Sequence, residues 1–217
     1  MIVVNFKNYQ ETFGDGALKL AEICKKVSEK TGVKIIPAVS ALDALVIKEK
    51  LEMEVYLQNV DPLFEGRGSG LISPLKAVEL GINGTILNHS EHRMKAGTLK
   101  KMLKSWPKKF KSIVCIGSLG QTNFWAKNIK ADFIAYEPRD LIGSKEKSVA
   151  TEKEKTIKKI VEIYKKIPVL VGAGIHSVKD VEISLKMGAK GILISSMIVK
   201  SKDPEKELTK LAEVFGV

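Results

Sequence analysis

The sequence predicts a closed (β/α)8 barrel, an α/β fold in which residues 1–217 form a single catalytic domain. Short runs of β-branched apolar residues alternate with longer amphipathic stretches along the whole chain. A helical stretch follows a strand-like run in every segment, which is typical of a parallel sheet with right-handed crossovers. No linker, low-complexity tract or shift in composition interrupts this alternation, so we expect one domain.

Eight runs are predicted as strands because each is short and apolar and ends in polar or small residues, as strands buried on both faces do. They are Ile2 to Phe6, Val33 to Ala38, Val55 to Asn59, Gly84 to Asn88, Ser112 to Ile116, Asp132 to Tyr136, Pro168 to Gly172 and Lys190 to Ser195. An open doubly wound sheet is the alternative, but that fold usually has a glycine-rich turn after its first strand. Here Lys7-Asn8-Tyr9 follows. A barrel usually takes about 250 residues, so we expect trimmed helices or loops.

Amphipathic stretches between the strands predict the helices. Apolar and charged residues interleave in Ala17 to Lys30 and in Thr156 to Lys166. The stretch Ser177 to Met187 has the same pattern and is followed by Gly188, a helix stop. Asp203-Pro204 opens a last helix, with the aspartate as its cap and the proline in its first turn.

Composition points to a globular protein of the cytoplasm. Hydrophobic residues make up 44% of the chain and charged residues 28%, both ordinary values. No apolar run approaches the roughly 20 residues that cross a membrane. Met1 to Phe6 lacks a basic leader and a small-residue cleavage site, which favours a first strand over a signal peptide. Cys24 and Cys115 belong to no metal-binding pattern, so we expect reduced core thiols.

The net charge of +11 allows three interpretations. A basic surface can bind nucleic acid, it can steer an anionic metabolite, or it can be a generally lysine-rich surface. The lysines are spread over many segments, which favours the third interpretation and no nucleic-acid partner. The dense stretch Lys100 to Lys111 is short and contains Leu103, Trp106 and Phe110, which could anchor a helix and its following loop on a core.

Polar residues stand where the predicted strands end, and in a barrel the carboxyl ends of the strands carry the chemistry. Asn5 and Lys7 are two apart at the end of the first strand, so both side chains should point into the barrel mouth. The other ends read Gln58-Asn59, Asn88-His89-Ser90-Glu91, Tyr136-Glu137-Pro138, Gly172-Ala173-Gly174-Ile175 and Ser195-Ser196.

Lys7 and Glu137 abut apolar strands, and charged residues are rarely buried unless they are paired. A shared, partly dry pocket would suit proton transfer. The alternatives are a structural ion pair that closes the barrel mouth and, for His89, a hydrogen-bonded core histidine. His89 and His92 have no third ligand at suitable spacing, so we expect no metal and no cofactor.

Small residues follow the late strands and indicate an anion site. Gly143 follows the sixth strand, Gly172 and Gly174 the seventh, and Ser195-Ser196 the eighth. Such residues let backbone N–H groups approach a phosphate closely, and phosphate sites at the late strands are frequent in this fold. Glycine as ordinary turn material is the alternative at each position.

These motifs, in this order, resemble the triosephosphate isomerase family in its archaeal branch, over essentially the whole chain. Asn5-Phe6-Lys7, Asn88-His89-Ser90-Glu91, Tyr136-Glu137-Pro138, Gly172-Ala173-Gly174-Ile175 and the block Gly191 to Ser196 carry the resemblance. It implies a TIM barrel that interconverts D-glyceraldehyde 3-phosphate and dihydroxyacetone phosphate through an enediolate, in glycolysis and gluconeogenesis. It also implies a homodimer or homotetramer that needs no cofactor. Another barrel enzyme, acting on a sugar or indole phosphate, would explain the late glycines but not the other motifs.

The resemblance also implies roles for the residues. Glu137 is the general base, His89 polarises the carbonyl as a neutral imidazole, and Lys7 stabilises negative charge. Glu91 and Gln58 support these groups from behind, and Pro138 to Ala150 form a lid. The implied substrate and phosphate contacts are Asn5, Lys7, Ile142, Gly143, Ser144, Gly172, Gly174, Ser195 and Ser196. The lid departs from the family's Ile-Gly-Thr-Gly, since Ile142-Gly143-Ser144-Lys145 stands there.

Overall fold

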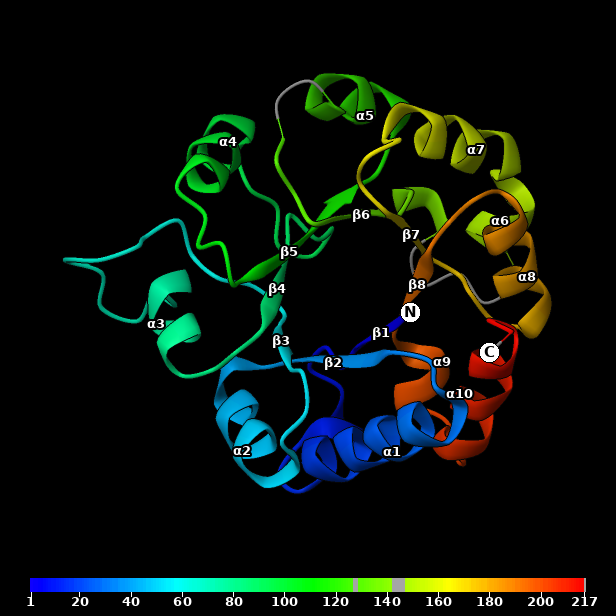
Figure 1. Ribbon diagram of the computed structural model, residues 1–217, viewed down its shortest axis with the longest axis horizontal. Helices are drawn as coiled ribbons and strands as arrows, with labels where there is room; N and C mark the ends of the chain where they lie inside the picture. Colours follow the sequence, from blue (N-terminus) through cyan, green and yellow to red (C-terminus); the bar gives the residue numbers. More distant parts are fainter. Residues whose placement is uncertain (127–128, 142–146, 217) are drawn as a thin grey trace.

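Eight parallel strands close into a barrel in the computed structural model, which describes residues 1–126, 129–141 and 147–216. Each strand pairs with the next along the chain, and the last strand pairs with the first. The helices lie around the outside of the barrel (Figure 1). The predicted (β/α)8 fold is therefore confirmed, and the open doubly wound sheet is excluded.

The observed strands overlap all eight predicted runs. They are β1 (Ile2–Asn5), β2 (Ile35–Val39), β3 (Tyr56–Leu57), β4 (Gly84–Leu87), β5 (Lys111–Ile116), β6 (Phe133–Tyr136), β7 (Val169–Gly172) and β8 (Gly191–Ile194). The predicted first and fourth strands run too far, to Phe6 and Asn88. Lys7 and Asn88 have positive φ angles of 51° and 57°, and this left-handed backbone cannot continue a strand.

Helices and short 3-10 turns connect the strands. They are η1 (Gln10–Thr12), α1 (Gly16–Thr31), α2 (Ala41–Leu51), α3 (Pro74–Glu79), α4 (Ala96–Lys104), α5 (Leu119–Ala126), η2 (Arg139–Leu141), α6 (Val149–Glu152), α7 (Glu154–Ile163), α8 (Val178–Lys186), α9 (Ser196–Val199) and α10 (Pro204–Glu213). Several have only one or two turns, which shortens the barrel as expected. No helix of the described residues is long and apolar enough to span a bilayer.

Helix ends are set by residues that the sequence makes visible. Gly32 ends α1 in the left-handed conformation, with φ 70°, and its N–H donates to the Ser28 carbonyl. The Ser177 hydroxyl accepts from the Asp180 N–H and begins α8, and the Asp203 carboxylate accepts from the Lys206 N–H and begins α10. The helix predicted over Thr156 to Lys166 lies earlier, at α7, because the chain leaves the helix after Ile163.

The core has two layers, one inside the barrel and one between strands and helices. Val3, Ile36, Ile86, Ile113 and Leu170 fill the inside of the barrel. The outer layer is larger and buries the apolar faces of the helices. Leu103 and Phe110 are buried in it, as the lysine-rich stretch predicts.

Both cysteines are free and buried, as predicted. Burial raises the pKa of the Cys24 thiol to about 12. Cys24 therefore stays protonated in the outer layer of the core.

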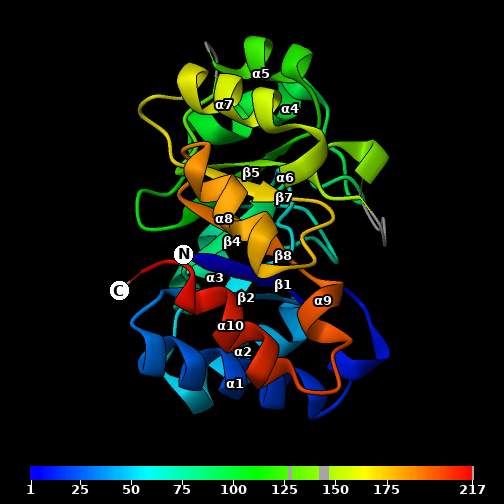
Figure 2. The ribbon, with the colours of Figure 1, turned by 90° about the vertical axis from the view of Figure 1, so that its right-hand side faces the viewer.

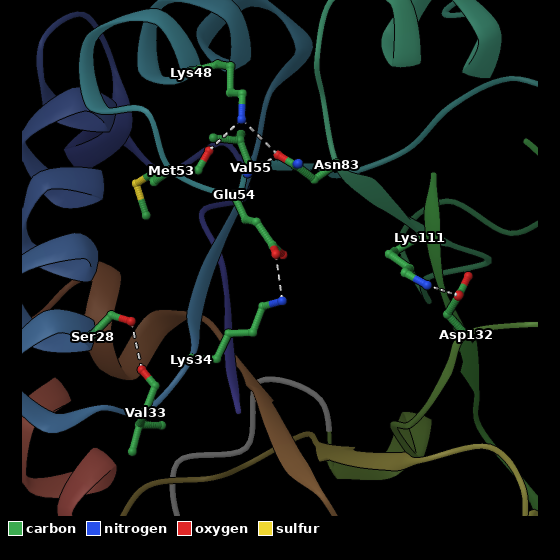
Figure 3. A network of polar contacts seen from close by, with 10 residues as sticks. All are labelled: Ser28, Val33, Lys34, Lys48, Met53, Glu54, Val55, Asn83, Lys111 and Asp132. Carbon is green, nitrogen blue, oxygen red and sulfur yellow. Dashed lines mark hydrogen bonds and ion pairs between the residues drawn. The ribbon is translucent and has the colours of Figure 1, made fainter. Parts of the chain in front are cut away.

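Charged side chains at the amino ends of the strands pair with one another (Figure 3). Lys34, before β2, pairs with Glu54, before β3, at 2.7 Å. Lys111, at the start of β5, pairs with Asp132, before β6, at 2.8 Å. Lys48 Nζ lies 3.4 Å from the Asn83 side-chain oxygen, next to β4. The charged groups at the amino end thus find partners among themselves and stabilise the barrel there. The polar residues at the carboxyl end are not part of these pairs.

Candidate active site

The carboxyl ends of the strands surround one hollow at the mouth of the barrel. Asn5 and Lys7 reach it from β1, His89 from β4 and Glu137 from β6. Gly174, Ser195 and Ser196 reach it from β7 and β8. The structure thus brings together polar residues that lie as much as 191 positions apart between Asn5 and Ser196.

Glu137 is buried, with 7% of its surface exposed, yet one carboxylate oxygen has no hydrogen-bond partner. Its backbone N–H donates to the Ile116 carbonyl at 2.8 Å, which holds the residue against β5. Gly172 lies directly below it: a Cβ at Gly172 would be 2.8 Å from Glu137 Cγ and 2.9 Å from Oε1. An unpartnered oxygen in a dry site can accept a proton.

His89 faces Glu137, and their nearest atoms, Nε2 and Oε2, are 3.5 Å apart. The Glu91 backbone N–H donates to His89 Nδ1 at 3.2 Å. A backbone N–H can only donate, so Nδ1 is the acceptor and the ring proton is on Nε2. His89 therefore presents an N–H donor to the hollow.

Lys7 is held from both sides of its left-handed backbone. Its N–H donates to the Asn5 side-chain oxygen at 3.1 Å, and its carbonyl accepts from Gln58 Nε2 at 3.0 Å. The Lys7 ammonium lies 2.6 Å from Glu91 Oε1. The side chain of Lys7 is 17% exposed and that of Glu91 is 56% exposed, so the pair stands at the rim of the hollow.

Cys115, near the end of β5, neighbours the Glu137 carboxylate. Burial and the neighbouring Glu137 carboxylate raise the pKa of its thiol well above the ordinary value. The thiol therefore stays uncharged and adds no negative charge beside Glu137.

Comparison with known proteins agrees with this arrangement. The family model described as triosephosphate isomerase matches residues 1–214. The chain belongs to the triosephosphate isomerase family. The triosephosphate isomerase of Methanothermus fervidus is 37% identical over 215 residues, covering 97% of this chain and 96% of the relative. That of Methanocaldococcus jannaschii is 34% identical over 215 residues, covering 97% and 98%.

A further relative, the triosephosphate isomerase of Saccharolobus solfataricus, is 35% identical over 210 residues, covering 95% of this chain and 92% of the relative. The resemblance to the archaeal branch is therefore confirmed. The chain is an isomerase of glycolysis and gluconeogenesis that interconverts the two triose phosphates.

Within this triosephosphate isomerase fold, most residues predicted for the site lie together, and a few do not. Gly172 packs under Glu137 and is not among the residues that line the hollow. Gln58 contacts the Lys7 backbone, and Glu91 contacts the Lys7 ammonium. Ile142, Gly143 and Ser144 lie outside the described residues.

The sequence reasoning missed several residues that line the hollow. Tyr9, Ile175, His176 and Met197 contribute to its wall. Tyr9 follows Lys7 by two positions, and Ile175 is the last residue of the glycine motif. His176 and Met197 directly follow the glycine and serine motifs. Their closeness to these motifs was the available signal.

His92 takes a different place from His89. Its Nε2 lies 3.3 Å from the Asn59 side-chain nitrogen at the rim. Across residues 1–126, 129–141 and 147–216, no three or more His, Cys, Asp or Glu side chains gather as a metal site would require.

Proposed function

We propose that Glu137 is the base that moves the proton during triose phosphate isomerisation, within a single catalytic domain spanning residues 1–217. The observation that carries this proposal is the buried Glu137 oxygen, which has no hydrogen-bond partner and faces the His89 ring. This oxygen has free lone pairs to accept a proton, because no hydrogen bond occupies it. Glu137 removes a proton from the carbon beside the carbonyl and returns it to the neighbouring carbon.

His89 and Lys7 supply the hydrogen-bond donor and the positive charge that stabilise the enediolate. The Nε2–H of His89 donates to the substrate's carbonyl oxygen as negative charge develops there, because Nδ1 is occupied by the Glu91 N–H. The Lys7 ammonium, which contacts the Glu91 carboxylate beside His89, adds a full positive charge. Asn5 and Gln58 hold the backbone of Lys7, and Glu91 holds its ammonium at the rim.

The phosphate binds at the late strands in this proposal. Gly174 and Ser196 line that end of the hollow, and the buried Ser195 hydroxyl there has no hydrogen-bond partner. A phosphate oxygen would give it one. Ile142, Gly143 and Ser144 complete the proposed set on the basis of sequence. Gly172 packs under Glu137 and supports the base instead.

The phosphate end can be tested by its effect on thermal unfolding. Phosphoglycolate at about 100 times its dissociation constant should stabilise the fold by about 2.7 kcal/mol, because it binds only the folded state. For a chain of this size that raises the melting temperature by roughly 5–10 °C. Glycolate, which lacks the phosphate, should give no shift at the same concentration. Equal shifts from both anions would refute a phosphate site.

Gly172→Ala should lower kcat by about 10²-fold, since the added methyl group pushes the Glu137 carboxylate from its place by a distance on the order of 1 Å. Gly97→Ala in α4 is the matched control, because a Cβ there meets nothing within 4 Å. Steady-state rates of the two variants show the effect of one added methyl group under Glu137 and in α4. Similar rates would mean that the position of Glu137 does not matter.

We also propose that the chain forms a homo-oligomer, a dimer or a tetramer, in the cytoplasm. Large apolar side chains are exposed on α2, on α3 and the residue that caps its end, and on the segment between these helices: Leu42, Val46, Leu71, Leu75 and Leu80. Such a concentration of exposed apolar side chains is typical of an interaction surface. Sedimentation of the purified chain would distinguish dimer, tetramer and monomer.

A further inference from the structure

Asp180, in the first turn of α8, is a buried carboxylate that the proposed chemistry does not use. Only 5% of its surface is exposed. Oδ1 accepts from the Ser148 hydroxyl at 2.5 Å, and Oδ2 accepts from the Ser177 hydroxyl at 2.8 Å and from the His176 N–H at 3.0 Å. One side chain thus joins the β7–α8 loop to the start of α6.

Part of this arrangement is an ordinary helix cap. The Ser177 hydroxyl accepts from the Asp180 N–H at 3.2 Å, and the carboxylate reaches back to Ser177 and His176. Capping α8 requires only these local contacts. The bond from Ser148 is different, because it comes from a residue 32 positions away.

The start of α6 touches the β7–α8 loop at two further points. The Val149 N–H donates to the Ala173 carbonyl at 3.1 Å. Gly174 passes so close to Lys147 that a Cβ on it would lie 2.3 Å from the Lys147 carbonyl oxygen. The helices α6 and α8 accordingly lie side by side (Figures 1 and 2). The Ser148–Asp180 bond therefore closes a contact between these two segments.

The loop that this contact holds has an unfavourable backbone. Ala173 and Gly174 both have positive φ angles, 72° and 67°, and an alanine rarely adopts this conformation. Strained backbone of this kind persists only when its surroundings hold it in place. The same residues, with Ile175 and His176, line the phosphate end of the hollow.

We propose that Asp180 is a positioning residue for the phosphate end of the active site. By binding Ser148, it fixes the β7–α8 loop so that Gly174 presents its backbone to the substrate's phosphate. Asp180 itself does not touch the substrate. This inference rests on the proposed placing of the phosphate at Gly174, Ser195 and Ser196.

Asp180→Asn tests the proposal with a side chain of nearly the same size. The amide would place an N–H group where the carboxylate now accepts hydrogen bonds. We expect kcat/KM for glyceraldehyde 3-phosphate to fall roughly 10- to 100-fold, mostly through a higher KM, because the phosphate end is displaced. Glyceraldehyde, which has no phosphate, should exchange its C2 proton for deuterium at the wild-type rate.

Three further variants separate positioning from stability. Ser148→Ala removes the bond between the segments together with the cap of α6, where the Ser148 hydroxyl accepts from the Thr151 N–H at 3.1 Å, and should cause the same phosphate-dependent loss. The double variant Ser148→Ala/Asp180→Asn should have no higher KM than Asp180→Asn alone, because both changes break the same Ser148–Asp180 hydrogen bond. Ser177→Ala removes only the local cap and should lower the melting temperature without changing KM.

Asp132→Asn is the matched control at the opposite end of the barrel. Its carboxylate accepts from the Ser112 N–H at 2.9 Å and from the Ser112 hydroxyl at 3.1 Å. It also accepts from the Lys111 ammonium at 2.8 Å (Figure 3). It has as many donors as Asp180, so its loss should cost stability but leave KM unchanged.

The proposal is overturned if Asp180→Asn slows both substrates equally, or if Ser148→Ala leaves KM for glyceraldehyde 3-phosphate unchanged. Should Asp180→Asn not fold, Ser148→Ala alone decides between the two outcomes. Failure here is distinguishable from failure of the proposed base. Near-normal turnover by Glu137→Gln would refute that assignment whatever the Asp180 variants do.

Discussion

Glu137→Gln is expected to lower kcat for triose phosphate isomerisation by roughly 10²–10⁴-fold while the barrel stays folded. The amide has nearly the same volume but cannot take a proton from carbon. Glu137 is buried and its Oε2 has no partner, so the substitution breaks no hydrogen bond at that atom. Steady-state rates in a coupled assay, together with thermal unfolding, separate the loss of the base from a loss of structure.

Glu54→Gln is the control for this experiment. Glu54 pairs with Lys34 at 2.7 Å at the amino end of the barrel, away from the hollow (Figure 3). Exposed pairs of this kind contribute only about 0–1 kcal/mol to stability, so turnover should be unchanged. Near-normal turnover by Glu137→Gln, with the control also normal, would refute the assignment of Glu137 as the base.

The sequence predicts the barrel because its strands are buried on both faces. Their apolar, β-branched character is visible without any knowledge of partners, and so are the caps at Ser177 and Asp203. The strand ends are harder to predict. Lys7 and Asn88 have left-handed backbones, and residues of these types also fit at a strand end. The third strand is shorter than predicted, since only Tyr56–Leu57 pair with β2 and β4.

The site is predicted in part because a barrel brings all carboxyl ends of its strands to one mouth. A polar residue at the end of β1 and another at the end of β6 must then face the same space. Contacts between loops follow no such rule. Nothing in the spacing of Ser148 and Asp180 indicates that they meet, and Gly172 reads as a phosphate glycine although it packs under Glu137. Both contacts join residues from different segments, and they become visible only when the strands that carry these segments are placed side by side.

Lys7→Met should lower kcat/KM by roughly 10²–10³-fold, since it removes a charge aimed at the developing enediolate. Lys7 is the one lysine among the described residues that line the hollow. Its backbone is held by Asn5 and Gln58, neither of which contacts the ammonium, so the barrel should keep its stability. The substitution frees the Glu91 carboxylate, which is 56% exposed and remains hydrated. Steady-state kinetics and thermal unfolding measure both effects.

Lys200→Met separates a positioned charge from the general positive field of a chain with net charge +11. Lys200 Nζ lies 4.1 Å from the centre of the Tyr9 ring, and Tyr9 lines the same hollow. Both variants lose one positive charge, but only Lys7 lines the hollow. If catalysis needs an ammonium in contact with the substrate, Lys200→Met changes kcat/KM little and mainly at low salt, where distant charges are least screened. Equal losses in the two variants would mean that the field of the surface, and not the place of Lys7, stabilises the transition state.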